Sequence, residues 1–260
     1  MTNPLFKVIQ GQSPLLISCP HDGILIPPDI AARMTTDAQI APDTDWHVAK
    51  LYSFAEGLGA TTIVPSHSRY VVDLNRSPED VSLYPGQNTT GLCPVVQFNG
   101  KPIYLEDQQP STVEINARVD RYWRPYHQAL RDELARLRKM HDRVVLWEAH
   151  SIRSVVPFLF EGRLPDINLG TASGASCSTA TQQRLQVVLD AQDRFTHVIN
   201  GRFKGGYITR QYGQPAVGVD AIQLELAQVN YMHEDSYEYL PDRAEPLQNL
   251  IRSLLEAALK

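Results

Sequence analysis

Two histidines in this chain closely follow short apolar runs that are typical of buried β-strands. His150 stands three residues beyond the run at 144–147, and His21 follows the run at 15–19 in a Pro-His-Asp-Gly turn. Polar side chains at the carboxyl ends of buried strands lie where open α/β sheets form their ligand crevice. Either histidine alone is also consistent with an ordinary strand-end or turn residue, so a metal-site hypothesis needs further side chains.

Two carboxylates could join these histidines. Asp45 precedes a helical pattern at 46–58, and Glu225 lies in the segment 221–226, which alternates apolar and polar residues as a strand does. Asp45 would also suit the first turn of a helix, where it interacts favourably with the helix dipole, and the face that carries Glu225 could be exposed to solvent. Two histidines and a carboxylate with an open fourth position form the ligand set of a catalytic zinc site, beside which another carboxylate can act as general base. Together the four residues predict a metal-dependent hydrolase.

A second group of residues has the chemistry to bind a small anion. Asn75 and Arg76 follow the apolar run at 70–72, and an arginine fork beside an amide can bond a carboxylate at several points. The alternative for Arg76 is an ordinary surface salt bridge. The glycine-bearing loop at 201–210 could bind an anion or simply be solvated, and its cationic residues are Arg202, Lys204 and Arg210.

These residues must be positioned by an alternation of strands and helices. Apolar runs predict strands at 15–19, 61–64, 70–72, 144–147, 196–199 and 221–226. Apolar residues at three- and four-residue spacing predict helices at 46–58, 114–140, 181–191 and 246–259. Pro125 is expected to kink or split the second of these helices. The segments 77–112 and 157–178 are expected to be long loops, the first of which covers another part of the molecule.

The length and composition suit one large α/β domain or two small ones, and they exclude several classes of protein. The net charge of -5 argues against nucleic acid or an anionic membrane as the partner. No run approaches the roughly 20 apolar residues of a membrane span, and the N-terminus lacks a signal-peptide pattern. The 3 cysteines are widely spaced, which favours reduced thiols and a cytoplasmic location. We find no GxGxxG dinucleotide motif and no GxSxG elbow, and the sequence specifies no oligomeric state.

The sequence resembles the N-formylglutamate amidohydrolases, the deformylases of histidine catabolism. The matching motifs are spread in order through nearly the whole chain: SCPHDG, PDTDWH, SRYVVDLNR, YWRPYH, LWEAHSIRS, LFEGRLPDINLGT, NGRFKGGYITRQYG and IQLELAQVNYM. That family is similar in fold to zinc carboxypeptidases and aspartoacylase. The resemblance therefore implies a single catalytic domain over residues 1–260, with a three-layer α/β/α architecture around a mostly parallel or mixed sheet.

The resemblance also implies a role for individual residues. His21 in PHDG matches the first metal-binding histidine and His150 in EAHS matches the last, with zinc or another divalent transition metal as the ion. Glu225 in QLELA matches the general base. Asn75 and Arg76 in DLNR match the pair that binds a substrate carboxylate.

The third metal ligand departs from the carboxypeptidase pattern. In that pattern a glutamate stands three residues after the first histidine, where this chain has Ile24. Asp45 is the preferred ligand and Asp22 is the alternative, because adjacent residues such as His21 and Asp22 seldom both reach one metal from a strand-like turn.

The reaction that the resemblance implies is hydrolysis of N-formyl-L-glutamate to formate and L-glutamate, in the cytoplasm. Because this substrate has two carboxylates, a second cation is expected besides Arg76, and Arg69 and Arg210 are the candidates. Two other functions stay open. One is a metalloamidase that acts on another N-acyl amino acid, and the other is a non-catalytic protein that binds dicarboxylates.

Overall fold

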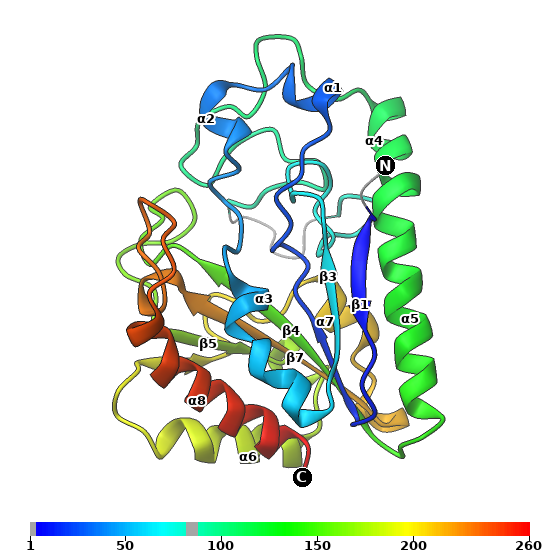
Figure 1. Ribbon diagram of the computed structural model, residues 1–260, viewed down its shortest axis with the longest axis vertical. Helices are drawn as coiled ribbons and strands as arrows, with labels where there is room; N and C mark the ends of the chain where they lie inside the picture. The colour runs from blue at the N-terminus through cyan, green and yellow to red at the C-terminus, as the bar shows by residue number, and fades with distance from the viewer. Residues whose placement is uncertain (1–3, 82–87) are drawn as a thin grey trace.

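The computed structural model describes residues 4–81 and 88–260, and their core is a 7-stranded mixed sheet (Figure 1). In spatial order the strands are β1 (Phe6–Ile9), β3 (Thr61–Pro65), β2 (Leu15–Ser18), β4 (Val144–Ile152), β7 (Val219–Ala227), β5 (Ile167–Gly170) and β6 (His197–Ile199). β3, β2, β4 and β7 run parallel to one another, while β1 is antiparallel to β3 and β5 is antiparallel to β7. The predicted α/β class with a mixed sheet is therefore confirmed.

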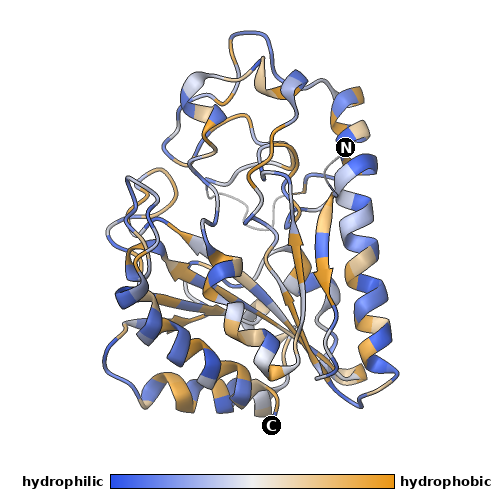
Figure 2. Ribbon diagram, viewed as in Figure 1, coloured by the Kyte–Doolittle hydropathy of each residue, from blue (hydrophilic) through white to orange (hydrophobic). Residues whose placement is uncertain are grey.

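Helices cover both faces of the sheet because the central strands are apolar on both sides. One face, which carries Leu16 and Leu146, packs against α5 (Arg124–Arg138) and α7 (Tyr207–Tyr212). The other face, which carries Ile17 and Trp147, packs against α3 (Val48–Leu51), α6 (Thr179–Asp190) and α8 (Pro241–Ala258). Figure 1 shows α5 on one side of the sheet and α6 and α8 on the other, and in Figure 2 the central strands are largely hydrophobic while the helices are two-sided. The result is three layers.

A π-helical turn, η2 (Val119–Trp123), interrupts the long helical segment beside the sheet. It connects α4 (Thr112–Arg118) to α5 and lies just before Pro125. The predicted helix at 114–140 is thus confirmed, and it contains this π-helical turn in place of the kink or split expected at Pro125. The other elements are short: α1 (Pro28–Ala31), α2 (Thr36–Gln39) and the 3-10 turns η1 (Ser53–Leu58), η3 (Ala172–Gly174), η4 (Pro215–Val217) and η5 (Gln228–Asn230).

The predicted strand at 70–72 is wrong, whereas the other predicted strands are confirmed within a few residues. Tyr70, Val71 and Val72 are buried in the same cluster as α5. The amide of Val71 nevertheless bonds back to the carbonyl of Ser68, so this segment turns instead of extending. Its apolar residues reflect burial and not strand pairing.

Further differences concern elements with weak sequence signals. The sequence does not predict β1, β5 or α7, and β5 lies inside the segment 157–178 that was expected to be a loop. The helices at 181–191 and 246–259 are confirmed as α6 and α8, although α8 already begins at Pro241. The helix expected at 46–58 is divided between α3 and η1.

The loop expected at 77–112 lies partly outside the described residues, because it includes 82–87. All 3 cysteines are free, as predicted, and they are also buried. Among residues 4–81 and 88–260, no helix combines the length and the apolarity that a bilayer crossing requires.

Candidate active site

The carboxyl ends of the neighbouring parallel strands β2, β4 and β7 bring the predicted site residues together. His21 follows the end of β2, and His150 on β4 faces Glu225 on β7. His150 lies within a strand that continues to Ile152, so it is not beyond the strand end as predicted. Because parallel strands of one sheet end at the same edge, these three residues, which are far apart in the sequence, line one pocket.

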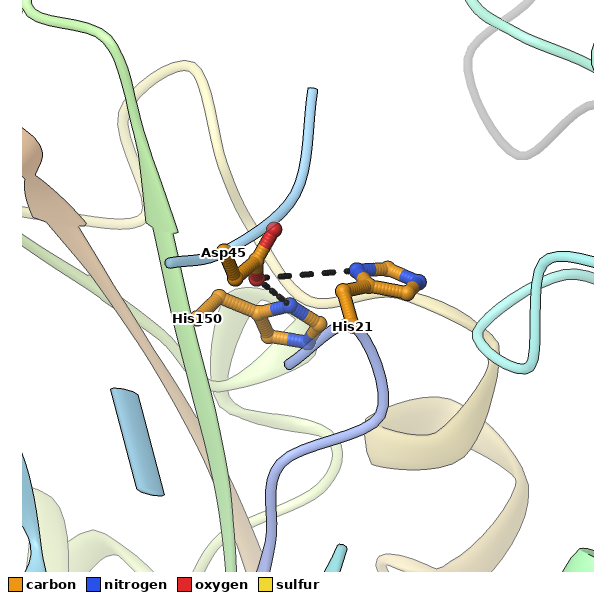
Figure 3. Close-up of side chains that lie close together, drawn as sticks. All are labelled: His21, Asp45 and His150. Atoms are coloured by element: carbon orange, nitrogen blue, oxygen red, sulfur yellow. Dashed lines mark hydrogen bonds and ion pairs between the residues drawn. The ribbon is translucent and has the colours of Figure 1, made fainter. Parts of the chain in front are cut away.

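His21, Asp45 and His150 form a buried cluster whose potential ligand atoms all lie within 4.8 Å of one another (Figure 3). The Oδ2 atom of Asp45 lies 3.0 Å from Nδ1 of His150 and 3.6 Å from Nδ1 of His21. Figure 3 shows both rings directing Nδ1 toward this carboxylate. Asp22, the alternative ligand, lies outside the cluster, and its Oδ1 accepts a hydrogen bond from the amide of Ala49 at 3.2 Å.

Each histidine is held through its other ring nitrogen. Nε2 of His21 lies 2.7 Å from Oδ1 of Asp73. Nε2 of His150 lies 3.4 Å from Oε1 of Glu148 and 3.0 Å from Nδ2 of Asn75. The tautomer of His150 decides which of these two contacts is a hydrogen bond, because Glu148 accepts and Asn75 donates. With the proton of each ring on Nε2, both Nδ1 lone pairs are available to a metal, and a carboxylate supports each ring as is usual for metal-binding histidines.

The cluster contains polar atoms that a cation would satisfy. Nδ1 of His21 and Oδ1 of Asp45 are buried and have no hydrogen-bond partner, which is costly for atoms removed from water, although Oδ1 has an ion pair with Arg69 at 3.5 Å. Burial alone would raise the pKa of Asp45, but the adjacent His21 and His150 outweigh it and hold this pKa below its usual value. Asp45 is therefore ionised, as a metal ligand must be. Two imidazole nitrogens and one carboxylate oxygen fit zinc or a similar divalent ion.

Glu225 is the carboxylate of this pocket that is suited to accept a proton. It is buried in the pocket wall, where Nε2 of Gln223 donates to its Oε2 at 3.4 Å. Burial raises the pKa of Glu225 to about 8, although the nearby His150 opposes the shift. A divalent cation bound beside Glu225 would favour its ionised form and lower this pKa toward the range that suits a general base. The alternative that this strand face is exposed to solvent is wrong, because Glu225 is only 7% exposed.

Asn75 and Arg76 both line the pocket. Nε of Arg76 donates to the carbonyl of Thr90 at 2.9 Å, which orients the guanidinium. Oδ1 of Asn75 accepts from the amide of Ile208 at 2.9 Å, while its Nδ2 approaches His150. The carboxylate-binding pair that the resemblance implies therefore lies beside the histidine cluster.

The structure places the two candidates for a second cation, Arg69 and Arg210, differently. Arg69 lines the pocket, but its guanidinium is paired with Asp73 at 2.7 Å and with Asp45 at 3.5 Å. Arg210 is exposed on α7 and is not among the described residues that line the pocket. Arg202, from the same basic loop, does line it. The structure thus brings Arg202 and not Arg210 to the candidate site.

Two residues of the site, Asp73 and Glu148, are not predicted from the sequence, and Arg202 is predicted only as one of three cations in a loop that could bind an anion or be solvated. Glu148 lies two residues before His150 on one strand, so the alternation of side chains along a strand places both on the same face. The spacing of two residues in the sequence could therefore have predicted that Glu148 lies beside His150. The contact of Asp73 with His21 joins two separate loops, and no local pattern predicts it.

Known proteins resemble this chain over most of its length. A family model described as N-formylglutamate amidohydrolase matches residues 13–232. The chain is 51% identical over 251 residues to the N-formylglutamate deformylase of Pseudomonas aeruginosa, covering 96% of this chain and 94% of that protein. The N-formylglutamate deformylase of Pseudomonas putida is 48% identical over 251 residues, with the same shares of 96% and 94%.

Two solved structures have the same overall fold. The N-formylglutamate amidohydrolase from Ralstonia eutropha JMP134 gives a TM-score of 0.80 at 25% identity, over 98% of this chain and 95% of that chain. A gene product from Agrobacterium tumefaciens gives a TM-score of 0.73 at 18% identity, over 99% of this chain and 97% of that chain. At this identity the similarity is evidence for the fold only. The family model and the two Pseudomonas relatives show that the chain belongs to the N-formylglutamate amidohydrolase family.

Proposed function

We propose that this protein hydrolyses N-formyl-L-glutamate to formate and L-glutamate. The relatives named N-formylglutamate deformylase support this substrate. The observation that carries the proposal is a single pocket in which His21, Asp45 and His150 lie together with Glu225 and cationic side chains. A single catalytic domain over residues 1–260, a zinc carboxypeptidase-like fold, a place in histidine degradation and a cytoplasmic location are parts of the same proposal.

His21, Asp45 and His150 would hold one divalent cation, which is zinc by its donor set or another transition metal. When bound, such an ion acidifies water and polarises a carbonyl oxygen. Asp73 and Glu148 would keep the two rings in the tautomer that binds the ion, because each carboxylate lies against an Nε2 atom. This arrangement explains why buried carboxylates accompany both histidines.

Glu225 would act as the general base and then as the general acid. Its carboxylate would remove a proton from the attacking water and later deliver that proton to the departing amine. The strand pairing with His150 places Glu225 next to the cluster, and Gln223 orients its Oε2. The raised pKa of Glu225 suits both halves of this cycle.

The two carboxylates of the substrate would be bound by two different arginines. Arg76, with Asn75, would bind one, and Arg202 would bind the other, since both arginines line the pocket. Arg69 is paired with Asp45 and Asp73, so its role is to neutralise and position these carboxylates. We therefore propose Arg202 in place of Arg210 and Arg69 as the second substrate-binding cation.

The function is tested by assaying the purified protein on N-formyl-L-glutamate and N-acetyl-L-glutamate, before and after treatment with a chelator. We expect hydrolysis of the formyl compound with kcat/KM of about 10⁴ M⁻¹s⁻¹ or more, loss of activity on chelation and recovery with zinc. A preference for the acetyl compound would favour a metalloamidase for other N-acyl amino acids. Binding of the substrate without hydrolysis, unaffected by the chelator, would favour a non-catalytic dicarboxylate-binding protein.

A further inference from the structure

The backbone that carries Asn75 and Arg76 is held by side chains from the helical segment that begins at the π-helical turn. Nε1 of Trp123 donates to the carbonyl of Arg76 at 3.0 Å. Nε2 of His127 lies 2.8 Å from the carbonyl of Leu74. Trp123 and His127 are four residues apart and therefore lie on the same face of the helix. Two side chains of one helix thus fix the carbonyls on both sides of Asn75.

The backbone amides at the start of helix α7 also hold this segment. The amide of Tyr207 donates to the carbonyl of Asn75 at 3.3 Å, and the amide of Ile208 donates to its side-chain oxygen at 2.9 Å. Gly206 lies so close that a Cβ atom there would be 2.3 Å from Nδ2 of Asn75. Each carbonyl from Leu74 to Arg76 therefore has a donor from another part of the chain.

The hydrogen bonds of His127 define its tautomer. A backbone carbonyl can only accept, so Nε2 carries the proton that Leu74 receives. Nδ1 then accepts from the hydroxyl of Tyr212, which lies 2.8 Å away. Burial lowers the pKa of His127 to about 3, so the ring is neutral at physiological pH. The ring also stacks on Trp123 with a centroid distance of 3.6 Å and an interplanar angle of 18°.

The reaction proposed above gives Trp123 and His127 no chemical role, although both belong to the motif Tyr-Trp-Arg-Pro-Tyr-His at 122–127. His127 is fully buried and Trp123 is only 5% exposed, so neither is available to bind substrate from solvent. Neither lines the pocket among the residues that the structure describes. Their polar atoms are used instead on the backbone of the carboxylate-binding pair, and a π-helical turn at such a place is typical of functional sites.

We propose that Trp123 and His127 are positioning residues, which hold the segment Leu74–Arg76 so that Arg76 and Asn75 present their side chains to a substrate carboxylate. This inference rests on the carboxylate-binding role of Arg76 in the proposed function. An arginine contributes to binding only when its fork matches the carboxylate in direction and distance, so a backbone shift at Arg76 lowers affinity without touching the catalytic carboxylate.

The test is a double-mutant cycle between Trp123 and Arg76, read as KM and kcat for N-formyl-L-glutamate. Trp123→Phe removes the N–H donor and keeps a ring on His127. We expect it to raise KM roughly ten-fold with a smaller change in kcat, as the loss of one buried hydrogen bond would. In an Arg76→Met background, Trp123→Phe should change KM little, because it acts through Arg76. His127→Phe should behave like Trp123→Phe, and His127→Gln, whose amide can reach Leu74, should restore part of the affinity.

Trp147→Phe is the matched control. Its Nε1 donates to the hydroxyl of Tyr52 at 2.8 Å, in the core on the opposite face of the sheet. This variant should lower thermal stability and leave KM unchanged. If Trp123→Phe raised KM by the same factor in the wild-type and Arg76→Met backgrounds, the two residues would act independently and the proposal would be overturned. A wild-type KM for Trp123→Phe, together with a raised KM for Arg76→Met, would also overturn it. An unchanged KM for Arg76→Met itself would instead refute the binding role of Arg76 in the proposed function.

Discussion

His150 on β4 and Glu225 on β7 occupy facing positions of two neighbouring parallel strands. Paired residues of neighbouring strands point to the same face of a sheet, so the candidate metal ligand and the candidate base share one side. The relative position of the two side chains is set by backbone hydrogen bonds between the strands and not by a loop. Replacing one side chain should therefore leave the other in place, and the two roles can be tested separately.

Glu225→Gln should lower kcat by about 10²- to 10⁴-fold, because the amide cannot take a proton from water. The variant should bind the same amount of metal as the wild type, since Glu225 is not part of the ligand cluster. Steady-state kinetics together with elemental analysis of the same sample measures both quantities. Turnover close to that of the wild type would remove Glu225 from the mechanism.

Asp73→Asn should weaken metal affinity by about 10- to 100-fold while all three ligands remain, because it changes the partner of the His21 ring. Competition with a chromophoric chelator measures this affinity. Asp22→Asn is the control, since Asp22 is adjacent to His21 but bonds the amide of Ala49. If Asp22→Asn abolished metal binding and Asp45→Asn did not, Asp22 would be the carboxylate ligand.

Arg202→Met should raise KM for N-formyl-L-glutamate by about 10- to 100-fold, which corresponds to the loss of a hydrogen bond between charged groups. Arg210→Met removes a cation from the same loop region, but from an exposed position outside the described pocket lining. Its KM should stay within about two-fold of the wild-type value, which is typical of exposed charges. The reverse order of the two KM values would contradict the assignment of Arg202.

His127 should make folding less favourable in mild acid. Its pKa of about 3 in the folded protein lies below the value of about 6.5 expected for an unfolded chain, so the unfolded state binds the proton more readily. The contribution of neutral His127 to the free energy of unfolding is thus fully present above pH 6.5. It falls by up to about 1.4 kcal/mol per pH unit between pH 6.5 and pH 3. Between pH 7 and pH 5, urea unfolding should show a loss up to about 2 kcal/mol larger for the wild type than for His127→Gln. Identical pH dependence of the two proteins would rule out this contribution.

The strands that carry the site could be predicted because burial on both faces leaves an apolar run that ends at ionisable residues. This holds for the runs before His21 and His150 and for the segment around Glu225. The same reasoning fails at 70–72, where Tyr70, Val71 and Val72 are equally apolar but pack into the core from a turn. Apolarity reports that a residue is buried, whereas strand formation also needs a neighbouring strand with free backbone groups.

Local sequence does not predict which of Arg202 and Arg210 lines the pocket. Both belong to one basic loop region, and nothing in their neighbours distinguishes them. Helix α7 turns Arg210 to the surface, while Arg202 precedes the helix and lines the pocket. The direction of a side chain at a loop–helix junction depends on tertiary packing. By contrast, the residue types of His21, Asp45 and His150 suggest metal binding from the sequence itself, and the structure brings the three side chains together.

Anomalous diffraction from crystals of the protein as purified, with data collected on both sides of the zinc absorption edge, tests the metal site directly. We expect one anomalous peak, from an ion bound by Nδ1 of His21, Nδ1 of His150 and the carboxylate of Asp45. If zinc is replaced by another transition metal, the peak should appear at that metal's edge in the same place. A protein that is active on N-formyl-L-glutamate but binds its metal elsewhere, or binds none, would contradict the central claim.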